Sequence, residues 1–398
     1  MPARPVPNKR HPVQSTLSAV RAHQGQSPVH RLILAQAYAI QPLQRAPARP
    51  ALHPAAKMLT PETSGTPRPS APTTPATPPR VVRLLPSATQ ALCAVGGEHL
   101  LVGRSHECDF PASIRHLPIL TAQRIPHTAA PAEIDSMVSA ALAQSQSLYT
   151  IDEPLLRELR PDVILTQDLC DVCSINLETV QRLAASLPNS PRVVSLNPTT
   201  VEGTLDDLLT VALATGLQDR AMPAIVALRE RLYRTSDFVN PFDDGPVLAF
   251  LEWTDPLFCA GHWTPQIIER AGARHPLNPT VPKPTAGAAA GPQMAERVAG
   301  KSIRIPEDAL VAIRPEFLVI CPCGLDLDRT RECARALTAK TWWRDLPAVR
   351  NGRVALVDGN QMFNRPGPRL VDAYEWLVGW LQDRPDLIPP GFPWERFA

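Results

Sequence analysis

The stretch TIDEPLLRELRPDVIL, residues 150–165, decides the fold because its pattern occurs a second time in the chain. Shifted by 154 positions, it aligns with RIPEDALVAIRPEFLV, residues 304–319, and the two share an acidic residue, a leucine and an Arg-Pro pair at equal places. In each copy the acidic residue opens a helical pattern, the Arg-Pro pair ends it, and an apolar run follows. The repetition predicts two halves built on one plan.

Short apolar runs and helical patterns alternate on both sides of this stretch. VVRLL (81–85), DVILT (162–166) and RVVSL (192–196) have the composition of buried strands. SATQALCAVG (87–96) has a helical period, and we expect Ser87 near its N-cap. This alternation is typical of mostly parallel sheets covered by helices. We therefore predict an α/β fold of two Rossmann-like lobes with a ligand cleft between them.

A long helix is expected to join the two lobes. Apolar residues recur at helical spacing through residues 216–240, and Pro223 would mark the first turn of this backbone helix. The N-terminal α/β lobe then spans residues 81–215, and the C-terminal α/β lobe spans residues 241–398.

Residues 1–80 differ from the rest of the chain in composition. They contain 16 of the 46 prolines and 10 Lys or Arg, and Glu62 is their only acidic residue, so they carry a formal charge of +9 against −7 for the remainder. Such a segment buries too little apolar surface to offset its ordering entropy, and we expect it to be disordered. Its composition resembles an organelle transit peptide, while a start at Met58 would leave a cytosolic protein. Both expectations favour an organelle or the cytoplasm over the periplasm, because no convincing secretory signal is present.

Several classes of protein are disfavoured by the sequence. No run approaches the 18 or so apolar residues of a membrane span. No Walker loop or Gly-x-Gly-x-x-Gly motif follows a predicted strand, and the acidic globular part lacks the basic stripe of a nucleic-acid-binding protein. A cysteine nucleophile with His106 or His262 as its base is conceivable, but no nucleophile elbow surrounds either residue. We predict that the protein is not an enzyme and that it is a monomer.

Four of the eight cysteines cluster in CDVC (170–173) and CPC (321–323). The repeat sets these two motifs opposite each other, so thiolates of Cys170, Cys173, Cys321 and Cys323 could hold a metal ion or form disulfides across the cleft. Small polarizable residues at strand exits are the alternative interpretation.

Polar and aromatic residues follow the predicted strands, where ligands of α/β proteins bind. SHECDF (105–110) brings together several side chains that could bind metal, react or line a cleft. Large aromatic residues such as Trp253 and Phe363, beside glycines and prolines, suit stacking on a flat, extended ligand.

Several motifs, in order, resemble the cobalamin-binding branch of the iron/vitamin B12 periplasmic-binding superfamily: RVVRLLPSATQALCAVG, LVGRSHECDFP, IDEPLLRELRPDVILTQDLCDVC, EWTDPLFCAGHWTPQII, ICPCGLDL and VALVDGNQMFNRPGPRLVD. The resemblance covers about residues 80–382. It implies two lobes around a corrinoid, with heme or a ferric siderophore as alternatives. It also implies delivery to an ATP-driven importer. In the cytosol or an organelle, the protein would instead be an intracellular corrinoid carrier that stores, chaperones or senses the ligand. A cysteine-dependent metalloprotein or hydrolase on the same scaffold is the competing interpretation.

The resemblance also implies site residues, and no cofactor beyond the ligand itself. His106 would ligate a bound cobalt axially or hydrogen-bond the macrocycle, while Glu178 and Glu332, related by the same shift of 154, would dock on the importer. The expected ligand-binding residues are Pro86, Ser87, His106, Glu107, Cys108, Asp109, Phe110, Gln167, Trp253, Phe258, His262, Trp263, Asn360, Phe363, Asn364 and Arg365.

Overall fold

Each half of the chain builds one main sheet and one separate two-stranded pair in the computed structural model, which describes residues 77–126, 129–144, 147–169, 175–241, 243–284 and 297–397. Residues 73–398 form one compact unit. The predicted disordered extension, with Met58, lies outside the described residues apart from its last four positions, and so do Cys170 and Cys173.

Lobe one contains a sheet of four parallel strands in the order β2-β1-β5-β6. Strands β3 and β4 lie between β2 and β5 in the sequence and form a separate antiparallel pair. The strands are β1 (Val81–Arg83), β2 (Leu101–Gly103), β3 (Thr121–Gln123), β4 (Tyr149–Ile151), β5 (Val163–Thr166) and β6 (Arg192–Ser195), and the helices are α2 (Pro86–Ala94), α3 (Pro131–Ala143), α4 (Glu153–Leu159), α5 (Leu177–Ser186) and α6 (Val201–Thr215).

Lobe two contains a six-stranded sheet in the order β11-β8-β7-β12-β13-β14, whose central strands β7, β12 and β13 are parallel. Its edges are antiparallel, and β9 and β10 form a separate antiparallel pair. The strands are β7 (Leu248–Thr254), β8 (Leu257–Cys259), β9 (Val281–Pro282), β10 (Arg297–Val298), β11 (Ile303–Arg304), β12 (Phe317–Ile320), β13 (Val354–Val357) and β14 (Trp394–Arg396), and the helices are α8 (Thr264–Arg270), α9 (Glu307–Ala312), α10 (Leu327–Thr338), α11 (Pro347–Arg350) and α12 (Leu370–Leu381).

The repeated stretch forms the same unit in both lobes, which confirms the two-lobed α/β prediction. Helix α4 leads to β5 and helix α9 leads to β12, and both strands are buried along their whole length. Between helix and strand, Arg160 and Arg314 adopt left-handed backbone conformations with φ of 41° and 48°. Such a residue ends a helix, and the proline after it prevents the helix from continuing.

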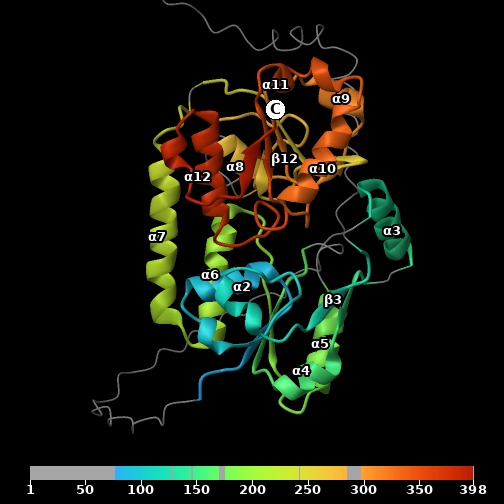
Figure 1. Cartoon of the computed structure of the whole chain (residues 1–398). Coiled ribbons are helices and arrows are strands. Elements are labelled where there is room, and N and C mark those ends of the chain that lie inside the picture. The colour runs from blue at the N-terminus through green and yellow to red at the C-terminus, as the bar shows by residue number, and fades with distance from the viewer. Residues whose placement is uncertain are drawn as a thin grey trace, which may run out of the picture. The chain divides into compact units, whose positions relative to one another are not determined.

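Helix α7 (Gln218–Ser236) contacts both lobes, packing against α6 of lobe one and α12 of lobe two (Figure 1). Arg220 donates to the carbonyl oxygen of Gly96 in lobe one at 3.0 Å. Near the other end, Arg231 donates to Asp372 and to both carboxylate oxygens of Glu375 in lobe two at 2.5–2.9 Å.

Two details of the helices differ from the sequence prediction. Helix α2 begins at Pro86 and its N-cap is Leu85, so Ser87 lies inside the first turn and does not cap the helix. Pro223 is the sixth residue of α7 and not part of its first turn, because the helix already begins at Gln218. A proline inside a helix removes one backbone hydrogen bond. The packing of α7 against α6 and α12 stabilises the helix despite this loss.

Buried aromatic residues gather in one part of the core of lobe two. The indole of Trp376 stacks on Phe392 and Trp380 with ring centroids 5.2 and 5.5 Å apart.

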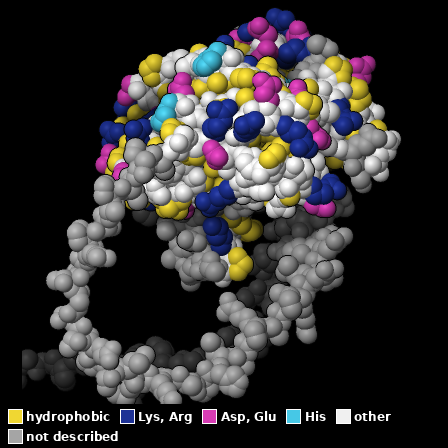
Figure 2. All heavy atoms as spheres, turned by 90° about the horizontal axis from the view of Figure 1, so that it is seen from below, with side chains coloured by type: hydrophobic (Ala, Val, Ile, Leu, Met, Phe, Trp, Pro, Cys, Tyr) yellow, Lys and Arg dark blue, Asp and Glu magenta, His cyan; other side chains and the backbone are white. Residues whose placement is uncertain are grey.

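Seen from below, the described surface carries Lys and Arg side chains interspersed with acidic and apolar ones (Figure 2). Among the described residues, no helix combines the length and the apolar run that a membrane crossing requires.

Candidate ligand site between the lobes

The loop after β2 carries SHECDF and has a fixed backbone shape. The amide of Cys108 donates to the carbonyl oxygen of Ser105 at 3.1 Å, and the amide of Glu107 donates to the Ser105 hydroxyl at 3.2 Å. Arg104 then donates to the carbonyl oxygens of Ser105 and Cys108 at 3.3 and 3.1 Å. These bonds hold Asp109 and Phe110 at the end of the turn.

The facing loop of lobe two follows β13 and is shaped by Asp358. Its carboxylate accepts from the backbone amides of Asn360 and Gln361 at 3.0 and 2.9 Å. A Cβ atom on Gly359 would lie 1.9 Å from the carbonyl oxygen of Pro322, so only glycine lets this loop pass the strand-exit loop after β12. The arrangement presents Asn360 and Arg365 to lobe one.

Asp109, Asn360 and Arg365 join the two lobes, and we call these three residues the interlobe clamp. Asp109 accepts from Arg365 at 2.6 Å and from the side-chain amide of Asn360 at 3.2 Å. Arg365 also donates to the Asn360 side-chain oxygen and to the carbonyl oxygen of Glu107, both at 2.9 Å. Arg365 is only 7% exposed. Removing its partner would cost about 3–5 kcal/mol, since a buried charge would be left uncompensated.

A cation–π contact lies next to the clamp. The guanidinium carbon of Arg369 is 4.2 Å from the centroid of the exposed Phe110 ring. Arg369 also donates to the Gln361 side chain at 3.1 Å and lies 3.6 Å from Asp372. Burial lowers the pKa of Arg369, opposed by Asp372. Sequence reasoning missed this residue, although the four-residue spacing of the two arginines in NRPGPR was a visible signal.

A second set of contacts joins the lobes at the start of α3. The indole N–H of Trp253 points to the carbonyl oxygens of Pro131 and Asp255, at 3.2 and 3.1 Å. Arg329 donates to the carbonyl oxygen of Ala129 at 2.9 Å. Trp253 is half-buried, and its contact with Pro131 brings its indole to the start of α3 in lobe one.

His106 and Glu107 lie on lobe one at the same loop. The Nδ1 atom of His106 is 2.7 Å from the Thr121 hydroxyl, and the ring lies tilted against Tyr149. Burial raises the pKa of the Glu107 carboxyl, and the charge of Asp109 adds to this while Arg365 opposes it. The two side chains therefore form a half-buried polar surface beside the clamp.

Other predicted ligand-binding residues lie in the core. Phe363 is 1% exposed and packs edge-on against Phe250 and Trp376, and Trp263 donates its indole N–H to the Phe363 carbonyl oxygen. Cys108 is fully buried and accepts from the Thr89 hydroxyl at 3.0 Å. Sequence reasoning located these residues at strand exits but could not determine which way each side chain turns.

The remaining predicted residues are dispersed around the two lobes. Pro86, Ser87 and Gln167 are buried in lobe one, while Phe258 is half-buried on β8. His262 is half-buried with φ of 57°, and burial followed by the nearby Lys301 lowers its pKa. Asn364 donates to the carbonyl oxygens of Gly359 and Cys321, which makes it a support of the loop.

Of the four cysteines predicted to bind a metal or form disulfides, two lie among the described residues. Cys321 is buried, and burial raises the pKa of its thiol. Cys323, two positions later, is exposed. Cys170 and Cys173 lie outside the described residues. Within the part of the chain that the structure describes, no three His, Cys, Asp or Glu side chains gather as a metal site.

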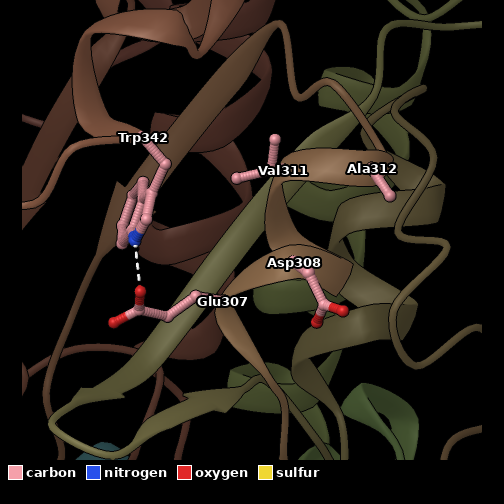
Figure 3. Close-up of a pocket in the computed structure, with 5 residues that line it drawn as sticks. All are labelled: Glu307, Asp308, Val311, Ala312 and Trp342. Atoms are coloured by element: carbon pink, nitrogen blue, oxygen red, sulfur yellow. Dashed lines mark hydrogen bonds between the residues drawn. The ribbon is translucent and has the colours of Figure 1, made fainter.

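An open depression of about 470 Å³ lies on lobe two, and none of the residues that line it was predicted as a site residue (Figure 3). Glu307 accepts there from the Trp342 indole and from Lys340, each at 2.7 Å. These bonds lower the pKa of the exposed Glu307 carboxyl. The residues around it are Glu307, Asp308, Val311, Ala312 and Trp342.

The proposed docking acids do not occupy equivalent helical positions. Glu178 is in the first turn of α5, whereas Glu332 is the sixth residue of α10 and pairs with Arg329. The connection from strand to helix is shorter in lobe two, so the shift of 154 no longer applies there. The first-turn acid of α10 is Asp328, which is exposed and lies 2.7 Å from Arg331.

Comparison with known proteins gives matches among solved structures only. No protein-family model and no curated protein matches the sequence. A periplasmic heme-binding protein from Pseudomonas aeruginosa matches with a TM-score of 0.56 at 21% identity, over 77% of this chain and 94% of its own. The periplasmic vitamin B12-binding protein BtuF of Vibrio cholerae matches with a TM-score of 0.52 at 15% identity, over 77% and 98%.

A third solved structure, the periplasmic heme-binding protein RhuT from Roseiflexus sp. RS-1 in its apo form, has a TM-score of 0.55 at 18% identity and covers 77% of this chain and 99% of its own. Identities this low establish the fold. The chain therefore has the two-lobed fold of the periplasmic proteins that bind vitamin B12 and heme, which confirms the fold expected from the sequence motifs.

Proposed function

We propose that this chain is a substrate-binding protein that holds a metal-containing tetrapyrrole, in the first place a corrinoid, between its two lobes. Solved proteins with the same fold bind vitamin B12 or heme, which supports the ligand class. They are binding proteins, which favours binding over catalysis. Heme is the second candidate, because two of the three solved structures named above are heme-binding proteins.

The observation that carries this proposal is the meeting of strand-exit loops at the interlobe clamp. Asp109 and Phe110 come from the edge where the parallel strands of lobe one end, and Asn360, Arg365 and Arg369 come from the corresponding edge of lobe two. Ligands of α/β proteins bind at such edges. The ligand would enter when the clamp opens, and Phe110, His106 and Trp253 would then face it.

We propose that the partner is the membrane part of an ATP-driven importer. Exposed acids on α5 and α10, the helices that follow β5 and β12, would dock on it, namely Glu178 of lobe one with Asp328 or Glu332 of lobe two. The periplasmic setting of the solved proteins favours an extracytoplasmic site of action, in contrast to the location expected from the N-terminal composition.

A titration tests this proposal directly. The purified full chain is titrated with aquocobalamin and, separately, with hemin, while tryptophan fluorescence and the visible spectrum of the ligand are recorded. We expect saturable binding of at least one of them with a Kd below about 1 µM. Saturation by neither ligand would reject the proposed function. The variant His106→Ala, in the same titration, would show an altered metal spectrum if the imidazole ligates the metal.

A further inference from the structure

We infer that the exposed face of helices α6 and α7 binds a second copy of this chain, so that two molecules associate as a two-fold symmetric dimer. The inference goes beyond the proposed function, because it concerns different residues from the interlobe clamp and needs no bound ligand. It replaces the monomer that the sequence led us to expect.

Helices α6 and α7 form an antiparallel hairpin along one flank of the molecule (Figure 1). Only Gly216 and Leu217 separate them, and Gly216 turns the chain with φ of 75°. The guanidinium of Arg229 on α7 donates to the carboxylate of Asp206 on α6 at 2.8 Å. This ion pair fixes which residues of the two helices lie side by side.

Four exposed apolar side chains follow the ion pair along the hairpin, and we call them the apolar stripe. Three positions forward on α6 and three positions back on α7 place Leu209 beside Val226. Four positions further, Leu213 lies beside Met222. Steps of three and four residues return to the same face of a helix, so all four share the face of the ion pair. They are 36–54% exposed, and apolar side chains gathered on a surface mark interaction sites.

The charges at the end of the apolar stripe fit a second copy of the same hairpin. The side chains of Asp206 and Arg229 are 67% and 41% exposed, so each can also bond a group of another molecule. A two-fold axis parallel to the helices lays α6 of one copy on α7 of the other and keeps every residue at its level along the axis. Asp206 of each copy then meets Arg229 of the other, and the two stripes cover each other. The four helices form an antiparallel bundle through an isologous interface.

The balance of charge favours a second copy over a membrane. One acid and one base flank the apolar stripe, and the exposed Glu230 and Arg234 continue the mixture of signs on α7. Helices that lie on an anionic membrane instead carry Lys and Arg around their apolar face. A surface with equal numbers of acids and bases in register is complementary to itself.

Sedimentation equilibrium of the full chain tests the inference. We expect a reversible monomer–dimer equilibrium with a Kd of about 1–100 µM, because a small interface of this kind suits a transient complex. Leu213→Glu places an unpaired charge in the interface and should raise this Kd at least about tenfold. Leu142→Glu is the matched control, because Leu142 is also an exposed leucine in a helix, α3, and should leave the Kd unchanged.

An exchange of charges tests the proposed geometry. Asp206→Arg alone and Arg229→Asp alone should each weaken self-association, because like charges would then meet at both ends of the interface. An equimolar mixture of the two variants should form a heterodimer with a Kd near that of the unchanged chain, since each pair again has opposite signs. Both substitutions alter exposed side chains, so the variants should fold.

Four results would overturn the inference. They are a chain that stays monomeric at every concentration, an equal change of Kd in Leu213→Glu and Leu142→Glu, no recovery in the mixture of charge variants, and binding of the apolar stripe to anionic phospholipid vesicles in place of self-association. If Leu213→Glu fails to fold, the charge exchange decides the question. None of these measurements contains a tetrapyrrole, so their outcome and that of the ligand titration are distinguishable.

Discussion

His275 shows how burial alone can fix the charge state of one residue. Its ring is 1% exposed, and its Nδ1 atom lies 3.0 Å from the carbonyl oxygen of Leu248 at the start of β7. Burial lowers the pKa of His275 to about 4. The side chain is therefore neutral in the folded protein at every pH near neutrality.

Acid should destabilise the protein through His275. Between pH 6.5 and about 4 the unfolded chain binds a proton at this histidine and the folded chain does not, so the free energy of unfolding falls as the pH falls. From pH 7 to 4.5 we expect a loss of about 2–3 kcal/mol from this group. Urea unfolding at both pH values measures it, and the neutral variant His275→Gln should lose less stability on acidification. An equal loss in the variant would contradict the assignment, and the exposed His116→Gln is the control.

Residue identity alone could not determine which predicted site residues lie at the contact between the lobes. Asp109 and Arg365 contact each other, while the neighbouring Cys108 and Phe363 turn into the core. A loop residue has no periodicity that fixes the direction of its side chain, and burial of an aromatic ring serves a core as well as a ligand site. The sequence located the loops, and only tertiary packing selects the side chains.

At the scale of elements, the repeated unit carries a matching hydrogen bond in each lobe. Asp162, just before β5, accepts from the amide of Arg80 at 2.8 Å, and Glu316, just before β12, accepts from the amide of Val247 at 3.2 Å. In each case the acid holds the residue that precedes the first strand of its lobe. The acid is shared by both copies of the sequence pattern, and so is its role.

Removal of these acids should weaken each lobe separately. We expect Glu316→Ala to speed hydrogen exchange at the amide of Val247 and to leave Arg80 unchanged, and Asp162→Ala to do the reverse. Each substitution removes one hydrogen bond, so the expected loss of stability is about 0.5–1.5 kcal/mol. Exchange monitored residue by residue checks this, and faster exchange in both lobes from one substitution would argue against independent units.

The elements themselves were largely predictable, because helical periods and apolar runs are local properties of the sequence. The strands near residues 81, 163 and 192 and the helix–Arg-Pro–strand unit appear where the pattern places them. The equivalence of Glu178 and Glu332 was wrong in detail, since Glu332 lies inside α10 and not at its start. A shift that aligns two strands cannot account for a shorter loop after one of them.

At the scale of the whole molecule, the two-lobed arrangement followed from the repeat and is confirmed. The interlobe clamp did not follow, because its partners are 251 and 256 residues apart and nothing in the local sequence pairs them. Helix α7 was expected as a connection, but its attachment to both lobes through Arg220 and Arg231 depends on side chains that the helical pattern treats as ordinary surface residues.

The clamp has a consequence for the speed of ligand capture. A molecule held shut by Asp109 and Arg365 accepts a ligand only during brief openings, so the observed association rate in stopped-flow mixing should rise with ligand concentration and then level off at the opening rate. In Asp109→Asn the plateau should be higher, because the lobes separate more often. A rate that stays linear in ligand concentration would mean that the entrance is already open. With a plateau, the protein itself, and not diffusion, would set how fast cargo is taken up.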